Sequence, residues 1–431
     1  MNIFKFGGAS VKDASGVDNV CRIIKEQDTS RLGIVVSAMG KTTNALEEII
    51  ALYRQDDPIY LDKVDQLIHE HLEIITGLEN LAKEEGVGCL SRFRESGITK
   101  TITSLMHSLK GELQRNQSPN YSFLYDQVVS YGELLSTKIV AAYLNAHELN
   151  VVWMDARQLI KTDQKYRDAG VDWVKSAQQI QDKCKGAFFL TQGFIGSDTN
   201  GLTTTLGREG SDYTAGILAY CLDAEAVTIW KDVPGVLNAD PREFKDTILI
   251  ESMPYNEAIE LAFYGASVIH PKTLQPLQGK KIALKVRSFV NHNLTGTVIR
   301  QQDDIIPLMP CYIVRKNMTY LRISARDFSF IGEANISDIF HELNEKKVQV
   351  GLLQNSAISF SICIEDKYGK LEELMNALTA RYKVSAIENV SLYTVRHYDD
   401  SSVQRLASDR QVILKQFTQE TLQLIVKNDD H

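Results

Sequence analysis

A lysine and two adjacent glycines lie close to the start of the chain, in the segment Lys5-Phe6-Gly7-Gly8. Glycines have no side chain, so the backbone N–H groups of Gly7 and Gly8 can approach an anion closely. A lysine ammonium supplies a compact positive charge that suits a phosphoryl oxygen. A simple strand-to-helix turn with a surface lysine would show the same residues, so this segment alone permits phosphate chemistry without requiring it.

A second segment, from Val36 to Asn44, contains Gly-Lys-Thr at positions 40 to 42. The phosphate-binding P-loop needs another glycine five positions before Gly40, and Val35 stands there instead. We therefore reject a P-loop. A strand end followed by the start of a hydroxyl-rich helix remains, and the N-terminus of a helix attracts anions.

Two charged residues of opposite sign follow at a distance along the chain. Glu133 begins a strongly apolar helical stretch, where it is either an ordinary first-turn acid or the partner of a substrate ammonium. Arg208 can hold a carboxylate through two parallel hydrogen bonds. Ser211 and Asp212 then begin another helix, which Asp212 could cap. The hydroxyl run 203–205, the arginine, the glycines and the helix start together favour an anion-binding role.

Two turns form the last group of polar residues. One apolar run ends in Lys231-Asp232 and a Pro-Gly pair, and Arg242 follows in an Asp-Pro-Arg turn. Two tight turns are the simple interpretation. The functional interpretation is a loop that lines a nucleotide.

The helical segment Pro58–Gly77 contains His69-Glu70-His71. Two metal ligands on one helical face need a spacing of three or four residues, so we predict no metal site there. We expect these histidines on a solvated face.

Short apolar runs alternate with amphipathic helical stretches in the part of the chain before residue 305. Strands that alternate with helices imply a mainly parallel sheet with helices on both faces. Ligands bind at the carboxyl ends of such strands, where the glycine-bearing turns cluster here. The predicted strands are Ile3–Phe6, Leu32–Ser37, Val151–Asp155, Ala187–Thr191, Val227–Trp230 and Ala283–Ser288.

Two prolines lie close together at Pro307–Pro310, and we place a domain boundary there. The residues that follow are predicted to form a β-α-β-β-α-β unit, which is the ferredoxin-like order. Its predicted elements are Met318–Ser324, Ile336–Lys346, Val348–Leu353, Ser356–Ile364, Lys370–Ala380 and Ser391–His397.

The bulk composition excludes several classes of protein. A length of 431 residues suggests two or three domains. The net charge of -8 argues against nucleic acid or an anionic membrane as the main partner. No apolar run reaches the length of a membrane span, and Gly7 comes before any signal-peptide core could form. The cysteines are scattered without a Cys-x-x-Cys pair, which indicates free thiols in a reducing cytoplasm; they are Cys21, Cys89, Cys184, Cys221, Cys311 and Cys363.

Taken in order, these segments resemble the aspartate kinases of the amino-acid kinase superfamily. The resemblance implies a three-layer α/β/α catalytic domain at 1–305, a ferredoxin-like ACT module at 306–386 and an abbreviated second ACT module at 387–431. It also implies transfer of the γ-phosphate of ATP to the β-carboxylate of L-aspartate, the first step toward lysine, threonine and methionine. The matching segments are KFGGAS, SAMGKTTN, SYGELLS, TQGFIGS, TTTLGREGSDYTA, IWKDVPGV, ADPR and YGASVIHP.

The resemblance also implies a role for each matching residue. Lys5 and Asp212 would form the catalytic centre. Glu133 would hold the ammonium of aspartate and Arg208 its α-carboxylate. Ser37, Thr43 and Ser211 would contact the same substrate. ATP with Mg²⁺, the ion bridging its β- and γ-phosphates without protein ligands, would contact Lys5, Gly7, Gly8, Lys231, Asp232, Arg242 and Ser267.

Some positions depart from the pattern of that family. Gly351 matches a position where an aspartate often binds inhibitory lysine, so weak or absent inhibition by lysine is expected. ACT modules usually pair between subunits, so we expect a homodimer through this region. The departures in the catalytic domain are Ala9 for threonine, Glu209 for glycine, Lys231 for threonine, Leu237 for tyrosine and Ser267 for lysine.

Two other functions fit part of the same pattern. One is a kinase of the same superfamily with another acidic or carbamoyl substrate. The other is a non-catalytic amino-acid sensor that keeps the fold. The pair Glu133 and Arg208 matches both charges of an amino acid, and the presence of Lys5 and Asp212 argues for catalysis.

Overall fold

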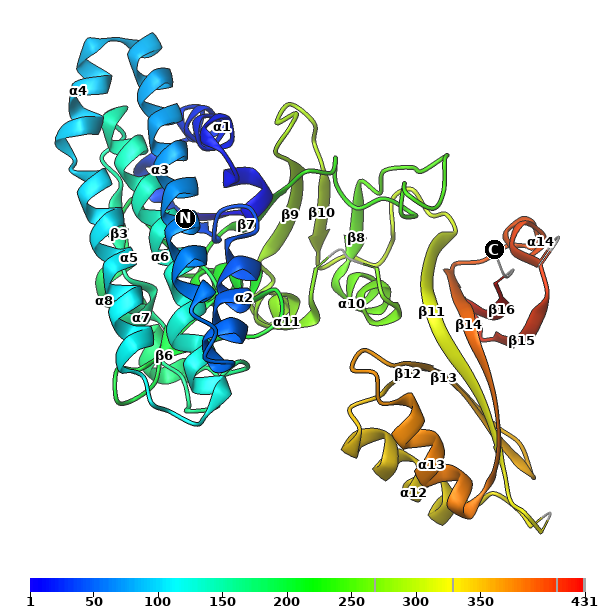
Figure 1. Cartoon of the computed structure of the whole chain (residues 1–431). Helices are drawn as coiled ribbons and strands as arrows, with labels where there is room; N and C mark the ends of the chain where they lie inside the picture. Colours follow the sequence, from blue (N-terminus) through cyan, green and yellow to red (C-terminus); the bar gives the residue numbers. More distant parts are fainter. Residues whose placement is uncertain (267–268, 328, 408–409, 429–431) are drawn as a thin grey trace. The chain divides into compact units, whose positions relative to one another are not determined.

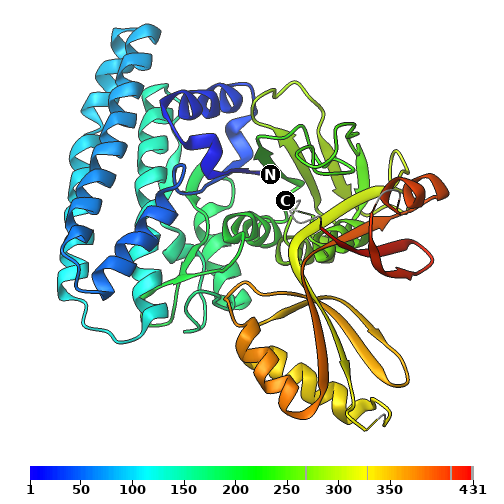
Figure 2. The same ribbon diagram turned by 45° about the vertical axis from the view of Figure 1, so that its right-hand side comes forward.

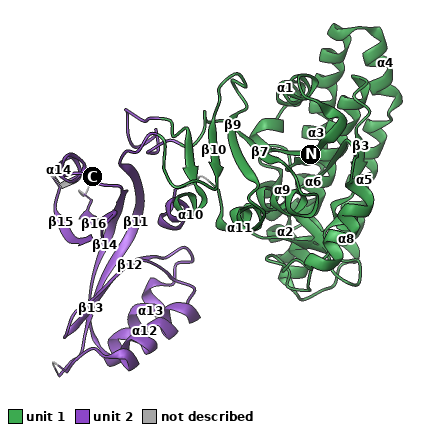
Figure 3. Ribbon diagram, turned by 180° about the vertical axis from the view of Figure 1, so that it is seen from behind, with its two compact units in different colours: residues 1–236, 249–259, 268–306 green, residues 237–248, 260–267, 307–431 purple. Residues whose placement is uncertain are grey.

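A computed structural model describes residues 1–266, 269–327, 329–407 and 410–428. The chain divides into two compact units, which Figure 3 shows in green and purple. Unit 1 comprises residues 1–236, 249–259 and 268–306, and unit 2 comprises residues 237–248, 260–267 and 307–431.

Unit 1 is built on an eight-stranded sheet with the order β3-β4-β2-β1-β7-β9-β10-β8. All neighbouring strands are parallel except β9 and β10. The six strands predicted from the apolar runs are confirmed. The strands are β1 (Asn2–Phe6), β2 (Leu32–Val36), β3 (Val152–Met154), β4 (Phe189–Gln192), β7 (Ala226–Lys231), β8 (Ser252–Pro254), β9 (Ala283–Ser288) and β10 (Thr297–Arg300).

Helices cover both faces of this sheet, as the sequence predicts, and the long helices α3, α5 and α6 lie side by side (Figures 1 and 2). A small hairpin of β5 (Ile195–Ser197) and β6 (Thr203–Thr205) forms a separate sheet. The helices are α1 (Ala14–Lys25), α2 (Thr42–Arg54), α3 (Ile59–Glu85), α4 (Val87–Glu95), α5 (Ile98–Arg115), α6 (Tyr121–Ala146), α7 (Ala156–Leu159), α8 (Trp173–Cys184), α9 (Gly210–Cys221), α10 (Tyr255–Tyr264) and α11 (Pro271–Lys280).

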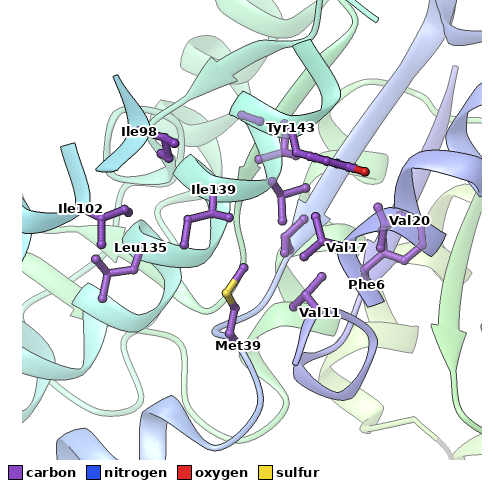
Figure 4. Close-up of a cluster of buried hydrophobic side chains, with 14 of the residues drawn as sticks. Phe6, Val11, Val17, Val20, Met39, Ile98, Ile102, Leu135, Ile139 and Tyr143 are labelled. Carbon is purple, nitrogen blue, oxygen red and sulfur yellow. The ribbon is translucent and has the colours of Figure 1, made fainter. Parts of the chain in front are cut away.

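The largest apolar cluster lies between the sheet and the helices on one of its faces (Figure 4). Phe4 and Phe6 of β1 point into it, and the Phe6 ring stacks on Trp230 of β7 with centroids 5.9 Å apart. Successive side chains of a strand point to opposite faces. The core on one face of β1 therefore leaves Lys5 on the other face, against which α9 packs.

The two histidines of α3 do not share one environment. His69 is 74% exposed beside Glu73, whereas His71 is buried and its Nδ1 lies 2.8 Å from the carbonyl of Leu67. The expectation of a solvated face is wrong for His71, because residues two positions apart lie on opposite sides of a helix. Burial lowers the pKa of His71.

Unit 2 contains a six-stranded antiparallel sheet with the order β12-β13-β11-β14-β16-β15. The predicted β-α-β-β-α-β order is confirmed by β11 (Cys311–Ser324), α12 (Glu333–Glu345), β12 (Gln349–Asn355), β13 (Ser359–Glu365), α13 (Leu371–Arg381) and β14 (Lys383–Arg396). β11 and β14 are each 14 residues long and pair along most of their length, so they continue into the part that carries the remaining elements. Those elements are α14 (Asp400–Ala407), β15 (Val412–Phe417) and β16 (Thr421–Lys427).

Helices α12 and α13 pack on one face of this sheet through Leu321, Ile362 and their neighbours. Leu406 of α14 instead packs against Val395 and Leu422. Among the helices that the structure describes, none combines the length and the apolar character that a membrane span needs.

Candidate active site

The carboxyl ends of four parallel strands meet at one edge of the sheet in unit 1. The register aligns Phe6 of β1 with Val36 of β2 on one side and with Trp230 of β7 on the other. Val36 in turn aligns with Gln192 of β4. The segments that the sequence singled out after these strands are therefore adjacent, and this edge is where ligands bind in open parallel sheets.

Lys5 and Asp212 form a buried ion pair at this edge. Lys5 Nζ lies 2.6 Å from Asp212 Oδ1, and the two side chains are only 11% and 4% exposed. Asp212 is the third residue of α9 and its backbone N–H donates to the carbonyl of Glu209. Glu209, and not Asp212, occupies the capping position. The capping interpretation of Asp212 is therefore wrong, and its carboxylate serves the lysine.

The glycines after β1 have two different functions in the structure. A Cβ atom on Gly7 would lie 3.4 Å from Lys5 Nζ, so Gly7 borders the ammonium. A Cβ on Gly8 would lie 2.7 Å from the carbonyl oxygen of Ala38, which is too close for any side chain. Gly8 also accepts a backbone hydrogen bond of 3.0 Å from Gly40. The loop after β1 thus packs directly on the loop after β2.

The loop after β2 is also fixed to α6. The hydroxyl of Ser136 donates to the carbonyl of Ser37 over 2.7 Å. The backbone N–H of Ala38 points to Glu133 Oε1 over 3.4 Å. Thr43 lies in the first turn of α2 and is half-buried. Ser37, Thr43 and Glu133 are therefore on elements that meet at this edge.

Glu133 lies in the middle of α6, which corrects its predicted position in a first turn. The helix begins at Tyr121, where Asn120 caps it by accepting from the N–H groups of Ser122 and Phe123. A Cβ on Gly132 would lie 2.9 Å from that of Ala38. This glycine permits close packing inside a continuous helix and does not end one.

The carboxyl group of Glu133 is buried, and no cation from the described residues pairs with it. Its residue is 3% exposed, and no group that the structure describes forms a hydrogen bond with Oε2. The contact from Ala38 to Oε1 is long for a hydrogen bond. Burial raises the pKa of Glu133 to about 8, and hydrogen bonds from its own backbone and from Ala38 oppose this shift only in part. An ammonium group placed here would supply the missing charge.

The loop between β6 and α9 contains Arg208, which is exposed. Ser211 in the first turn of α9 is buried and packs so closely on Gly193 that a Cβ on Gly193 would lie 2.4 Å from that of Ser211. The β4 end and the α9 start are thereby adjacent. Arg208 and Ser211 thus lie next to Asp212 in the same segment.

The hydroxyl run before this loop has a structural function, contrary to its predicted anion-binding role. Thr204 Oγ1 lies 2.7 Å from Thr162 Oγ1, and the Thr205 hydroxyl donates to Asp126. Asp126 also accepts from the backbone N–H of Thr205 and of Arg167. Burial raises the pKa of Asp126 to about 6.

Asp126 is therefore a supporting residue that sequence reasoning missed. An isolated acid in the apolar stretch between Leu124 and Val129 was the available signal.

The residues assigned to the nucleotide divide into three groups. Lys231 and Asp232 lie at the end of β7, directly beside the end of β1. Arg242 lies in unit 2, where its guanidinium forms a two-point contact with Asp240. Ser267 lies outside the described residues. The geometry thus brings Lys231 and Asp232 to the edge that carries Lys5.

Comparison with known proteins identifies the family to which this chain is similar. The model of the amino acid kinase family matches residues 1–288. The lysine-sensitive aspartokinase 3 of Escherichia coli is 30% identical over 368 residues, which cover 84% of this chain and 78% of that protein. The bifunctional aspartokinase/homoserine dehydrogenase 1 of Arabidopsis thaliana is 27% identical over 88% of this chain, which spans 42% of that longer relative.

Solved structures agree with these similarities. The structure of E. coli aspartokinase III in complex with aspartate and ADP is 26% identical, has a TM-score of 0.78, and is matched over 99% of this chain and 96% of that one. The same enzyme in complex with lysine and aspartate also has a TM-score of 0.78, at 25% identity and the same coverage. The chain therefore belongs to the amino acid kinase family, and within it to the aspartokinases.

Proposed function

We propose that this chain transfers the γ-phosphate of ATP to the β-carboxylate of L-aspartate, giving 4-phospho-L-aspartate. The observation that carries the proposal is the contrast between two buried acids at one sheet edge. Asp212 forms an ion pair with Lys5, whereas among the described residues no cation pairs with Glu133. A phosphate centre and a place for an ammonium group thus lie side by side, as an amino-acid kinase requires.

Lys5 carries the charge stabilisation in this proposal. Phosphoryl transfer needs little covalent help from the protein, and positioned positive charge at the transferring group is the main contribution. Asp212 holds the ammonium of Lys5 in place over 2.6 Å. Gly7 leaves the space beside this ammonium open to a phosphate. Lys231 and Asp232, at the end of the neighbouring strand, line the nucleotide.

The amino-acid substrate is held by its two charges. Glu133 receives the ammonium, which replaces the cation that the fold does not supply. Arg208 receives the α-carboxylate, because a guanidinium offers two parallel donors. Ser37, Thr43 and Ser211 supply hydroxyl groups around the same substrate.

We infer that ATP enters as its Mg²⁺ complex. No group of three or more His, Cys, Asp or Glu side chains suited to a metal occurs within the described ranges of the chain. Asp212 is paired with Lys5, so phosphate oxygens and water would supply the ligands of the ion. When bound with ATP, the ion would neutralise charge on the phosphates.

We further propose a cytoplasmic homodimer. All six cysteines are buried free thiols, which suits a reducing compartment. Strand β12 is an edge strand of the sheet in unit 2, with exposed residues such as Leu353. An edge strand presents unpaired backbone groups that favour pairing with another copy. Sedimentation of the purified chain measures this association directly.

A coupled assay of ADP release tests the activity. We expect release with aspartate, little with glutamate, and none above background without an acceptor. Equal release without an acceptor would show ATP hydrolysis only, and aspartate binding without release would show a sensor.

A further inference from the structure

Glu209 adopts a backbone conformation that is unusual for its residue type. Its φ is 52° and its ψ is 30°, in the left-handed region that favours glycine. It lies between Arg208 and Gly210, directly before α9. Non-glycine residues keep such a conformation only where the surroundings fix them, and they gather at functional sites. The contact that holds Glu209 in this conformation therefore indicates its role.

The carboxylate of Glu209 holds the start of another helix. Its Oε2 accepts a hydrogen bond of 2.8 Å from the backbone N–H of His270. His270 caps α11, since its Nδ1 accepts from the N–H of Lys272. A carboxylate is favoured at the positive N-terminal end of a helix. Glu209 is the capping-position residue of α9 but reaches across to α11 instead of bonding its own helix.

The two helices that Glu209 joins are packed on each other. A Cβ on Gly216 of α9 would lie 3.1 Å from the carbonyl oxygen of Thr273 in α11. The bodies of the helices are thus in contact, and the carboxylate of Glu209 ties their N-terminal ends. The loop 207–210 is thereby attached to the start of α11 through Glu209.

The contact also separates neighbouring charges. Lys272 is paired with Asp168. In the described part of the chain, Arg208 takes part in no ion pair. The Glu209 carboxylate is bonded to His270 and, within the described ranges, forms no ion pair with the adjacent guanidinium.

We propose that Glu209 is a positioning residue that clamps the loop 207–210 to the start of α11 and keeps Arg208 free for the substrate carboxylate. This inference rests on the proposed function. It predicts that loss of the clamp weakens aspartate binding more than turnover or ATP binding.

Three variants separate the hydrogen bond from the backbone strain. Glu209→Gln keeps an acceptor, Glu209→Ala removes it, and Glu209→Gly removes it while suiting the left-handed backbone best. We expect KM for aspartate to rise about tenfold in the alanine and glycine variants and to stay within about threefold in the glutamine variant. KM for ATP should not change. A folded glycine variant with the wild-type KM for aspartate would overturn the proposal.

Lys281→Gly is the matched control. Lys281 has a φ of 58° at the other end of α11. The variant therefore places glycine in the same left-handed conformation, but away from the loop 207–210. We expect wild-type kinetics. A tenfold rise in KM for aspartate here as well would show a general effect on α11 and would count against a specific clamp.

Amide hydrogen exchange provides a readout that does not depend on activity. Exchange in the peptide that contains His270 should be faster in the alanine and glycine variants than in the wild type and the glutamine variant. Unchanged exchange would refute the clamp. If the wild-type protein transferred no phosphate to aspartate, the proposed function would fail, and the exchange data would still decide whether the clamp exists.

Discussion

The regions around Asp212 and Glu133 lie at one sheet edge and each contains a buried acid, but the two acids differ in whether the fold supplies a cation. Asp212 lies 2.6 Å from an ammonium supplied by the same fold. Within the described ranges, the carboxyl group of Glu133 meets a backbone N–H at a long distance of 3.4 Å and no cation. A buried charge without a partner is costly, so the fold keeps one only where a ligand completes it. The comparison separates the part of the site that is complete from the part that awaits its substrate.

The largest effect is expected from removing the cation of the complete region. Lys5→Ala should lower turnover at least a hundredfold, because positioned charge at the transferring phosphate is lost. The variant also strands Asp212 without a cation, so it should unfold at a lower temperature. Steady-state kinetics and thermal melting measure both effects.

The double variant Lys5→Ala with Asp212→Asn is the control for folding, because it leaves no unpaired buried charge. It should regain stability but not activity. Near-normal turnover in either folded variant would remove Lys5 from the catalytic role.

The next effect concerns the incomplete region. Glu133→Gln should raise KM for aspartate about tenfold or more, because the ammonium loses its counter-charge, and should leave KM for ATP unchanged. It should not lower the melting temperature at pH 8, since glutamine removes a charge that the fold does not pair. Asp212→Asn should lower it by stranding Lys5. If Glu133→Gln were the more destabilising of the two, the contrast between the regions would be wrong.

The same comparison predicts a pH dependence. The folded pKa of Glu133 is raised from 4.5 to about 8, so the native state without substrate holds a proton that the unfolded chain has lost. Its contribution to stability is therefore present below pH 4.5 and is lost as the pH rises toward 8.

An ammonium that binds Glu133 must displace this proton. KM for aspartate should fall as the pH rises toward 8, by at most about tenfold per pH unit, and then level off. Calorimetry in buffers of different ionisation enthalpy should detect proton release on binding. Both effects should vanish in Glu133→Gln; a flat profile in the wild type would contradict the protonated state of Glu133.

The smallest effect is expected in unit 2. A Cβ on Gly351 would lie 2.9 Å from a guanidinium nitrogen of Arg315, and Glu365, the acid beside it, is already paired with this arginine. A lysine ammonium at this position would meet the positive charge of Arg315, whose neighbouring acid Glu365 is already paired. Titration of lysine into the kinase assay should cause little inhibition, with threonine titrated separately for comparison. Strong inhibition at micromolar lysine would show that lysine binds elsewhere or through another acid.

The local sequence determined the strands, the glycine-bearing turns and the ferredoxin-like order of unit 2. Apolar runs of strand length and turn residues act over a few positions, so they can be read without the fold. For the same reason Lys5 could be placed at the end of β1, and Arg208, Ser211 and Asp212 beside the start of a helix.

Only the tertiary structure decided what each of these side chains meets. Asp212 could have capped its helix, but packing of α9 on β1 places its carboxylate beside the ammonium of Lys5 instead. Glu133 was predicted in the first turn of a helix, and the continuous helix α6 instead places it mid-helix and buries it. The partner and the dielectric surroundings of a polar group are set by elements distant in sequence, so neither the pairing of Asp212 nor the raised pKa of Glu133 could be read from the local pattern.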